Sequence, residues 1–304
     1  VYDGHTNCKG DVDLMGKAMF SKRDLWKLIV PLVIEQALAV SVGMIDTIMV
    51  ANVGEAAVSG VSLVETVNIL LINLFTALAT GGSIVAAQYL GMRDIEKGRH
   101  AARQLVISVS FLSVGVTALC LLLNKPLLTA LLGQIEPAVM QSAQTYFYIT
   151  ALSYPFIAVF NAAAALFRGM GNTKVALLNA LVMNLVNIAG NSILIFALDM
   201  GVLGAALATL FSRIVAAASM LVMLRNPKHE IHIHGLRLWR LDFSMIRRIL
   251  RLGIPNGLEN SIFQFGRIIV TGMVAIHGTT AIAAHAVAGS LTGIEVIPGQ
   301  AIGL

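Results

Sequence analysis

The sequence predicts an all-α integral membrane protein, and three observations support this fold class. The 304 residues are 57% hydrophobic and 12% charged, whereas soluble domains carry about 25% charged residues. Apolar stretches long enough to cross a bilayer recur along the chain, and a segment near the start returns near the end. These features indicate a bundle of lipid-facing helices built from two related lobes.

The apolar stretches define the expected helices. A spanning helix needs about 20 mainly apolar residues, and lipid offers the backbone no partners outside its own segment. The short polar–apolar alternation of barrel strands is missing. An eighth helix begins near 280, and the seven before it lie at 27–51, 60–89, 104–123, 144–166, 175–198, 202–224 and 247–276.

Basic residues sort to one side of this arrangement. The N-terminal tail and the loops after the second, fourth and sixth predicted helices carry 18 Lys and Arg residues, and the opposite loops carry only Lys125. Because Lys and Arg concentrate in cytoplasmic loops, we predict a cytoplasmic N-terminus. The loop after the second helix is expected to carry Arg93, Lys97, Arg99 and Arg103.

An internal repeat relates the seventh predicted helix to the first. A shift of 224 residues matches ten of the residues at 28–57, among them Pro31 with Pro255 and Glu35 with Glu259. Six helices separate the copies, so both run in the same direction, as in transporters with parallel repeats. Each lobe should therefore contain six helices.

The repeat divides the chain into four segments. We predict a cytoplasmic tail at 1–24, a complete six-helix lobe at 25–224, a cytoplasmic linker at 225–245, and about two helices of a second lobe at 246–304. Because a second six-helix lobe would need about four further helices, we expect the chain to be a fragment of a longer protein.

Asp46 is the sharpest functional candidate. It lies in the outer half of the first helix, and its counterpart in the repeat is Val270. An acid at mid-membrane costs roughly 2.5–3.5 kcal/mol by insertion scales and usually lines a cavity or relay. Away from water, the charged form of a carboxyl group is disfavoured, so such a group can bind and release protons. An aspartate that serves packing alone is the alternative interpretation.

Other polar residues interrupt the apolar helices. Glu35 and Glu259 each follow a proline by four residues, where a helix bends, and they could contact solute or only satisfy the bend. One face of the fifth helix carries Asn184, Asn187 and Asn191. These asparagines could act as ligands or could form hydrogen bonds between helices. We predict that the cavity for the solute is lined by Glu35, Gln36, Asn184 and Glu259.

Further charged residues have weaker claims. Glu65 and Glu295 are acids in the second and eighth helices, and Arg213 and Arg267 lie within the sixth and seventh. We expect each arginine to pair with an acid or to extend toward an aqueous side.

Enzymatic and metal chemistry have no sequence support. The chain lacks GxSxG and Walker motifs and spaced Cys/His clusters, and the histidines of the linker do not have the HExxH spacing. An intramembrane aspartyl protease would need a second membrane aspartate beside Asp46. We therefore expect no cofactor or metal, and no nucleic-acid partner, because the basic residues belong to loops.

The sequence resembles the multidrug and toxic compound extrusion (MATE) family from about residue 20 onward. PLVIEQ, DTIMVANVGEAAVSG and ATGGSIVAAQYLG carry the resemblance in the first two helices, followed in order by FRGMGNTK, LGAALATLFSR, RLGIPNGLEN and HGTTAIAAHAVAG. The resemblance implies twelve helices in two lobes that export bulky, often cationic compounds in exchange for H+ or Na+. It also implies a monomer in the cell membrane, by default a bacterial inner membrane.

The resemblance assigns roles to individual residues. The family's helix 1 aspartate corresponds to Asp46, and its polar partners in helices 4 and 5 would be Asn161, Asn187 and Asn191. Because helix 5 carries no acid, the two-carboxylate site of some members is not expected. We predict proton coupling of the DinF-like kind rather than the sodium coupling of NorM-like members. A lipid-linked sugar flippase of the same superfamily is the rival interpretation.

Overall fold

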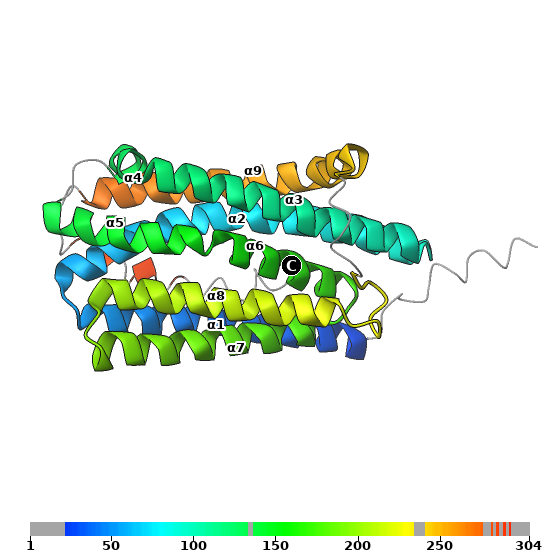
Figure 1. Ribbon diagram of the computed structural model, residues 1–304, viewed down its shortest axis with the longest axis horizontal. Coiled ribbons are helices and arrows are strands. Elements are labelled where there is room, and N and C mark those ends of the chain that lie inside the picture. Colours follow the sequence, from blue (N-terminus) through cyan, green and yellow to red (C-terminus); the bar gives the residue numbers. More distant parts are fainter. Residues whose placement is uncertain are drawn as a thin grey trace, which may run out of the picture.

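A computed structural model of the chain describes residues 22–132, 136–233 and 241–275, and a few single residues between 281 and 292. Every element in these ranges is a helix (Figure 1), so the all-α prediction is confirmed. The elements are α1 (Lys22–Ala51), α2 (Glu55–Gly91), α3 (Ile95–Leu122), α4 (Asn124–Leu132), α5 (Pro137–Leu152), α6 (Tyr154–Gly169), α7 (Thr173–Asn191), the π-helical η1 (Ser192–Ala197), α8 (Gly201–Leu224) and α9 (Phe243–Ala275).

Six of the predicted spans have the length and composition to cross a membrane. Five are single or continuous helices: α1, α2, α3, α7 with η1, and α8. The sixth is the pair α5 and α6, which bends by 50° at Ser153. α9 covers the seventh predicted span but holds only a short apolar stretch, Phe265–Val274, because polar residues such as Arg251, Asn256 and Glu259 precede it. The eighth prediction lies largely outside the described residues.

The helix boundaries differ from the prediction where helices leave the membrane. α3 begins at Ile95 rather than 104, because Asp94 caps it by accepting a hydrogen bond from the Lys97 amide at 3.1 Å. The loop after α2 is therefore short, and Lys97, Arg99 and Arg103 lie on the first turns of α3 rather than in a loop. A helix can extend beyond the bilayer where its residues are charged. The length of an apolar run does not include such an extension.

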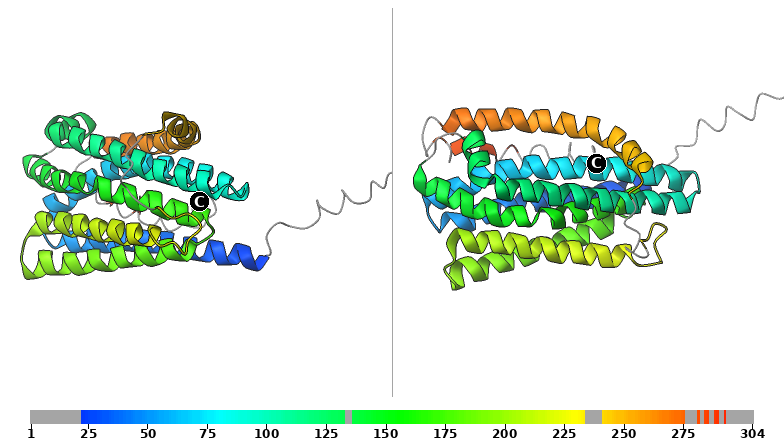
Figure 2. Two further views of the ribbon diagram at one scale, coloured as in Figure 1. Left: turned by 45° about the vertical axis from the view of Figure 1, so that its right-hand side comes forward. Right: turned by 45° about the horizontal axis from the view of Figure 1, so that its top comes forward.

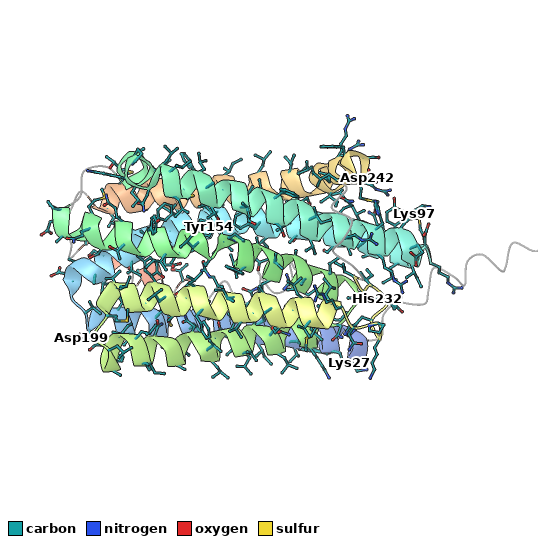
Figure 3. The ribbon with its side chains drawn as sticks, in the orientation of Figure 1. Lys27, Lys97, Tyr154, Asp199, His232 and Asp242 are labelled. Atoms are coloured by element: carbon teal, nitrogen blue, oxygen red, sulfur yellow. The ribbon has the colours of Figure 1, made fainter. Side chains whose placement is uncertain are left out.

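Several charged residues lie at the two ends of the bundle. Figure 3 shows near one end Lys27, Lys97, His232 and Asp242, and near the other end Asp199. The end that carries Lys27 and Lys97 is called the basic end. The alternation of helix directions that brings these residues together agrees with the charge sorting of the sequence.

α2 is the central helix of the fold. It packs against α3, α5, α6 and α9, while α1, α7 and α8 form a second group beside it (Figures 1 and 2). The approach of α2 to α9 is close because glycines meet there: a Cβ on Gly81 would lie 2.6 Å from the Gly253 amide nitrogen. Both glycines lie in the halves of their helices nearest the basic end.

Candidate functional site

A cavity of about 480 Å³ opens between the two groups of helices. Its walls come from α1, α2, α5, α7 and α8, with Arg267 of α9 and His285 at one side. Apolar residues make up about half of the lining, and polar side chains converge among them, so this cavity is more polar than the usual small-molecule site. The cavity brings together four charged side chains, Asp46, Glu65, Arg213 and Arg267.

Asp46 lies against the asparagines of α7. Asn191 donates a hydrogen bond from Nδ2 to Asp46 Oδ1 at 2.7 Å. With its amide turned so that nitrogen faces the acid, Asn187 donates to Asp46 Oδ1 at 2.9 Å and to Oδ2 at 3.2 Å. Both asparagines are buried, so the carboxyl group is held by donors that belong to the protein interior. The predicted trio of Asp46, Asn187 and Asn191 is thus assembled at one place.

Glu65 is the second acid of the cavity, and it comes from α2. Its Oε1 accepts hydrogen bonds from the Tyr146 hydroxyl at 2.7 Å and from Asn68 Nδ2 at 3.1 Å. Asn68 is held in turn by the Tyr154 hydroxyl, which donates to Asn68 Oδ1 at 2.6 Å. Tyr154 lies midway along the bundle in Figure 3. Two carboxyl groups therefore line one cavity, and the second comes from α2.

Arg213 of α8 lies on the same cavity without an acidic partner in the described contacts. Its Nη1 donates to Ser153 Oγ at 2.7 Å, at the bend between α5 and α6. Among the described contacts no acid pairs with Arg213, and the bend instead places a hydroxyl within its reach. The cavity can present both signs of charge to a solute.

Asn184 and Asn161 occupy different places. Asn184 lines the cavity and is buried, as predicted. Asn161 does not line it: its Nδ2 donates to Thr76 Oγ1 at 3.1 Å, across the α6–α2 contact. The reason is the bend at Ser153, beyond which α6 runs toward the basic end and carries Asn161 away from the level of Asp46. Its assignment as a partner of Asp46 is corrected accordingly.

Glu35 also lies away from the cavity. Its Oε1 pairs with Arg168 Nη1 at 3.2 Å, and both side chains are largely but not fully covered, at 13% and 15% exposure. Neither Glu35 nor Gln36 is among the cavity residues, because the α1 turn that carries them lies nearer the basic end than Asp46. The side chain of Glu259 lies outside the described part of the chain.

Sequence reasoning undervalued two residues of the site, Glu65 and Tyr146. A signal existed for Glu65, since Asn68 follows it by three residues on the same helical face within an apolar run. Tyr146 gave no such signal, because tyrosine occurs at many positions of membrane helices.

Known proteins resemble this chain over most of its length. A family model described as MatE matches residues 31–193. The chain is 26% identical over 282 residues to the "Uncharacterized transporter YisQ" of Bacillus subtilis, covering 91% of this chain and 61% of that protein. It is 27% identical over 288 residues to the "Probable multidrug resistance protein NorM" of Thermotoga maritima, covering 92% of this chain and 61% of that protein.

Solved structures share the arrangement of helices. A MOP superfamily transporter from Pyrococcus furiosus superposes with a TM-score of 0.83 at 25% identity, covering 92% of this chain and 62% of that chain. A multidrug resistance MATE family transporter in an outward-facing conformation gives a TM-score of 0.81 at 25% identity, with the same coverage. The chain thus spans less than two thirds of the length of these proteins.

Proposed function

The chain belongs to the MatE family, and from this premise we propose that it acts within a secondary transporter that exports small organic solutes in exchange for protons. The premise rests on the family match over residues 31–193. Relatives named as multidrug resistance or multidrug export proteins suggest the solute class. We propose that it works in the cell membrane with the basic end in the cytoplasm, where Lys and Arg accumulate.

One observation carries the proposal: Asp46 faces a drug-sized cavity and is held there by two buried amides. An intramembrane acid on a cavity is typical of proton and ion pathways. The volume of about 480 Å³ suits a small organic solute and favours it over a lipid-linked sugar chain.

The asparagines explain how proton binding can change the site. An ionised carboxylate only accepts hydrogen bonds, whereas a protonated carboxyl group also donates one. An asparagine amide can form a hydrogen bond with either form of the carboxyl group, because it can turn to present its NH2 group or its oxygen. Protonation of Asp46 would therefore reorient Asn187 or Asn191 and alter the packing of α1 on α7. This rearrangement is our proposed link between the proton and alternating access.

The coupling ion follows from the same contacts. Both asparagines direct their NH2 groups at Asp46, which suits a carboxyl group that changes protonation state, whereas Na+ bound there would need both amides turned so that their oxygens face it. We therefore propose a proton-coupled, DinF-like transporter. Each proton that enters down a 100 mV potential supplies about 2.3 kcal/mol, enough for a gradient of roughly fiftyfold in an uncharged solute. One-for-one exchange with a monovalent cation moves no net charge, so the pH gradient drives that exchange.

The test is transport by the full-length protein in proteoliposomes, with proton and sodium gradients imposed separately. Ethidium, a fluorescent organic cation, serves as the solute. The wild type should export ethidium under a proton gradient alone, and Asp46→Asn should abolish this export. Asp199→Asn is the matched control, because Asp199 lies in an exposed loop at the far end of the bundle.

Two results would contradict the proposal. Export by Asp46→Asn at the wild-type rate would show that this acid does not carry the proton. Export driven only by the sodium gradient would show that the coupling ion is wrong, while leaving the transport of organic solutes intact.

A further inference from the structure

The two acids of the cavity are held in different ways. Asp46 accepts hydrogen bonds from α7 amides that can turn in response to a proton. Glu65 instead belongs to a chain of contacts through α2, α5 and α6: Tyr154 donates to Asn68, and Asn68 and Tyr146 both donate to Glu65. The difference in partners suggests a difference in role.

The contacts of Glu65 fix its orientation. Tyr146 is 5% exposed, and Asn68 and Tyr154 are fully buried, so the three side chains have little freedom to move. Both described hydrogen bonds to Glu65 go to Oε1, which leaves Oε2 for a solute. A carboxyl group fixed before binding loses little conformational freedom when a ligand arrives.

The basic groups of the cavity do not neutralise Glu65 by direct contact. Arg213 faces the cavity but donates to Ser153. Arg267 and His285 also line it, from α9 and beyond. Among the ion pairs between described residues, none includes Glu65 or Asp46. A cationic solute therefore finds an acceptor without first breaking an ion pair in the described part of the site.

We propose that Glu65 is the specificity-determining carboxylate that binds the positive charge of the solute, while Asp46 handles the proton. The proposal rests on the transport function given above and adds a division of labour between the two acids. It also gives the exchange a physical cause. A proton on Asp46 removes one negative charge from the cavity, so a cation bound at Glu65 is held less tightly and leaves.

Equilibrium binding tests this role apart from transport. Ethidium, which keeps its positive charge at all working pH values, and the uncharged aromatic probe N-phenyl-1-naphthylamine are titrated into the purified full-length protein at pH 7.5. Glu65→Gln keeps the shape and the oxygen that accepts from Tyr146 and Asn68, and removes only the charge. It should weaken ethidium binding about tenfold or more and change the binding of the uncharged probe less than twofold.

Two further variants sharpen the comparison. Glu55→Gln is the matched control, because Glu55 is an exposed acid at the start of the same helix, and its ethidium affinity should equal that of the wild type. Glu65→Asp keeps the charge and should recover most of the ethidium affinity, which a merely structural role for Glu65 would not predict. Asp46→Asn mimics the protonated carboxyl group, so it should bind ethidium more weakly than the wild type but more tightly than Glu65→Gln does.

The outcomes separate this inference from the transport proposal. Unchanged ethidium binding by Glu65→Gln, or an equal loss of both probes, overturns the role of Glu65. If Glu65→Gln does not fold, failure of Glu65→Asp to bind ethidium better than the uncharged probe overturns it as well. If binding depends on Glu65 but no proton-driven export is seen, the inference stands and the proposed coupling fails.

Discussion

Asn191 of α7 donates a hydrogen bond to Asp46 of α1 at 2.7 Å, across 145 positions of sequence. Asn191 is 1% exposed and lies one turn from Asn187, which faces the same carboxyl group. This contact joins Asp46, the acid of α1 that lines the cavity, to α7, whose asparagines the sequence analysis identified as candidates. It makes α7 the partner of α1 in any change that follows proton binding.

Loss of this donor should slow transport. Asn191→Ala leaves Asp46 with one amide partner fewer, and a hydrogen bond to a charged group contributes about 1.5–3 kcal/mol. We expect the initial rate of proton-driven ethidium export to fall about tenfold or more. Asn172→Ala is the control, because Asn172 immediately precedes α7 and makes no capping hydrogen bond with its side chain. A wild-type rate in Asn191→Ala would show that the contact has no role in coupling.

The buried pair of Glu35 and Arg168 should be needed for stability. Glu35→Gln leaves the Arg168 charge buried without its partner, which typically costs about 3–5 kcal/mol, and the thermal unfolding midpoint in detergent should drop accordingly. The double variant Glu35→Gln with Arg168→Gln should regain much of the loss. Glu96→Gln breaks an exposed pair with Arg99 and should cost less than about 1 kcal/mol. Equal effects of the two single variants would contradict burial of the Glu35 pair.

The close approach of α2 and α9 should not tolerate a side chain at Gly81. The Cβ of Gly81→Ala would meet the backbone of Gly253 at 2.6 Å, and backbone atoms cannot turn away as a side chain can. We expect a loss of about 1–3 kcal/mol in the free energy of unfolding, measured by thermal unfolding. Gly91→Ala is the control on the same helix, because a Cβ there meets nothing within 4 Å. A neutral Gly81→Ala would mean that the helices are farther apart.

The start of α9 should respond to acid through Asp242. The His100 ring beside it, and then the Met245 and Ser244 amides that it accepts from, hold the pKa of Asp242 below its ordinary value. Because the folded-state pKa is lowered, these contacts stabilise the fold above the ordinary aspartate pKa of about 3.9. Their contribution is lost as the pH falls through the lower folded value.

Asp242→Asn removes this acid-sensitive contribution. Between about pH 5 and pH 3, the thermal midpoint of the variant should fall less than that of the wild type, while at pH 7 the variant should be the less stable protein. The effect should be small, because the pair is only partly covered. Parallel pH profiles for the two proteins would contradict a role for Asp242 in acid sensitivity.

Much of the fold could be predicted from the sequence, because the membrane constrains it. The bilayer thickness sets the length of a spanning helix, so the apolar runs predicted the positions of six spans and of the helix α9. The internal repeat singled out Asp46, because its counterpart is Val270. The spacing of Asn187 and Asn191 placed both on one face of α7. Such one-dimensional signals need no knowledge of how helices pack.

The partners of these residues depended on tertiary structure. Helices that face lipid are apolar on most sides, so periodicity does not reveal which face turns inward. Only the packing of α2 brought Glu65 into the cavity of Asp46, and only the bend at Ser153 carried Asn161 away and brought Ser153 to Arg213. The sequence by itself determined which residues are costly in a membrane, and the rotation and bending of the helices decided which of them meet.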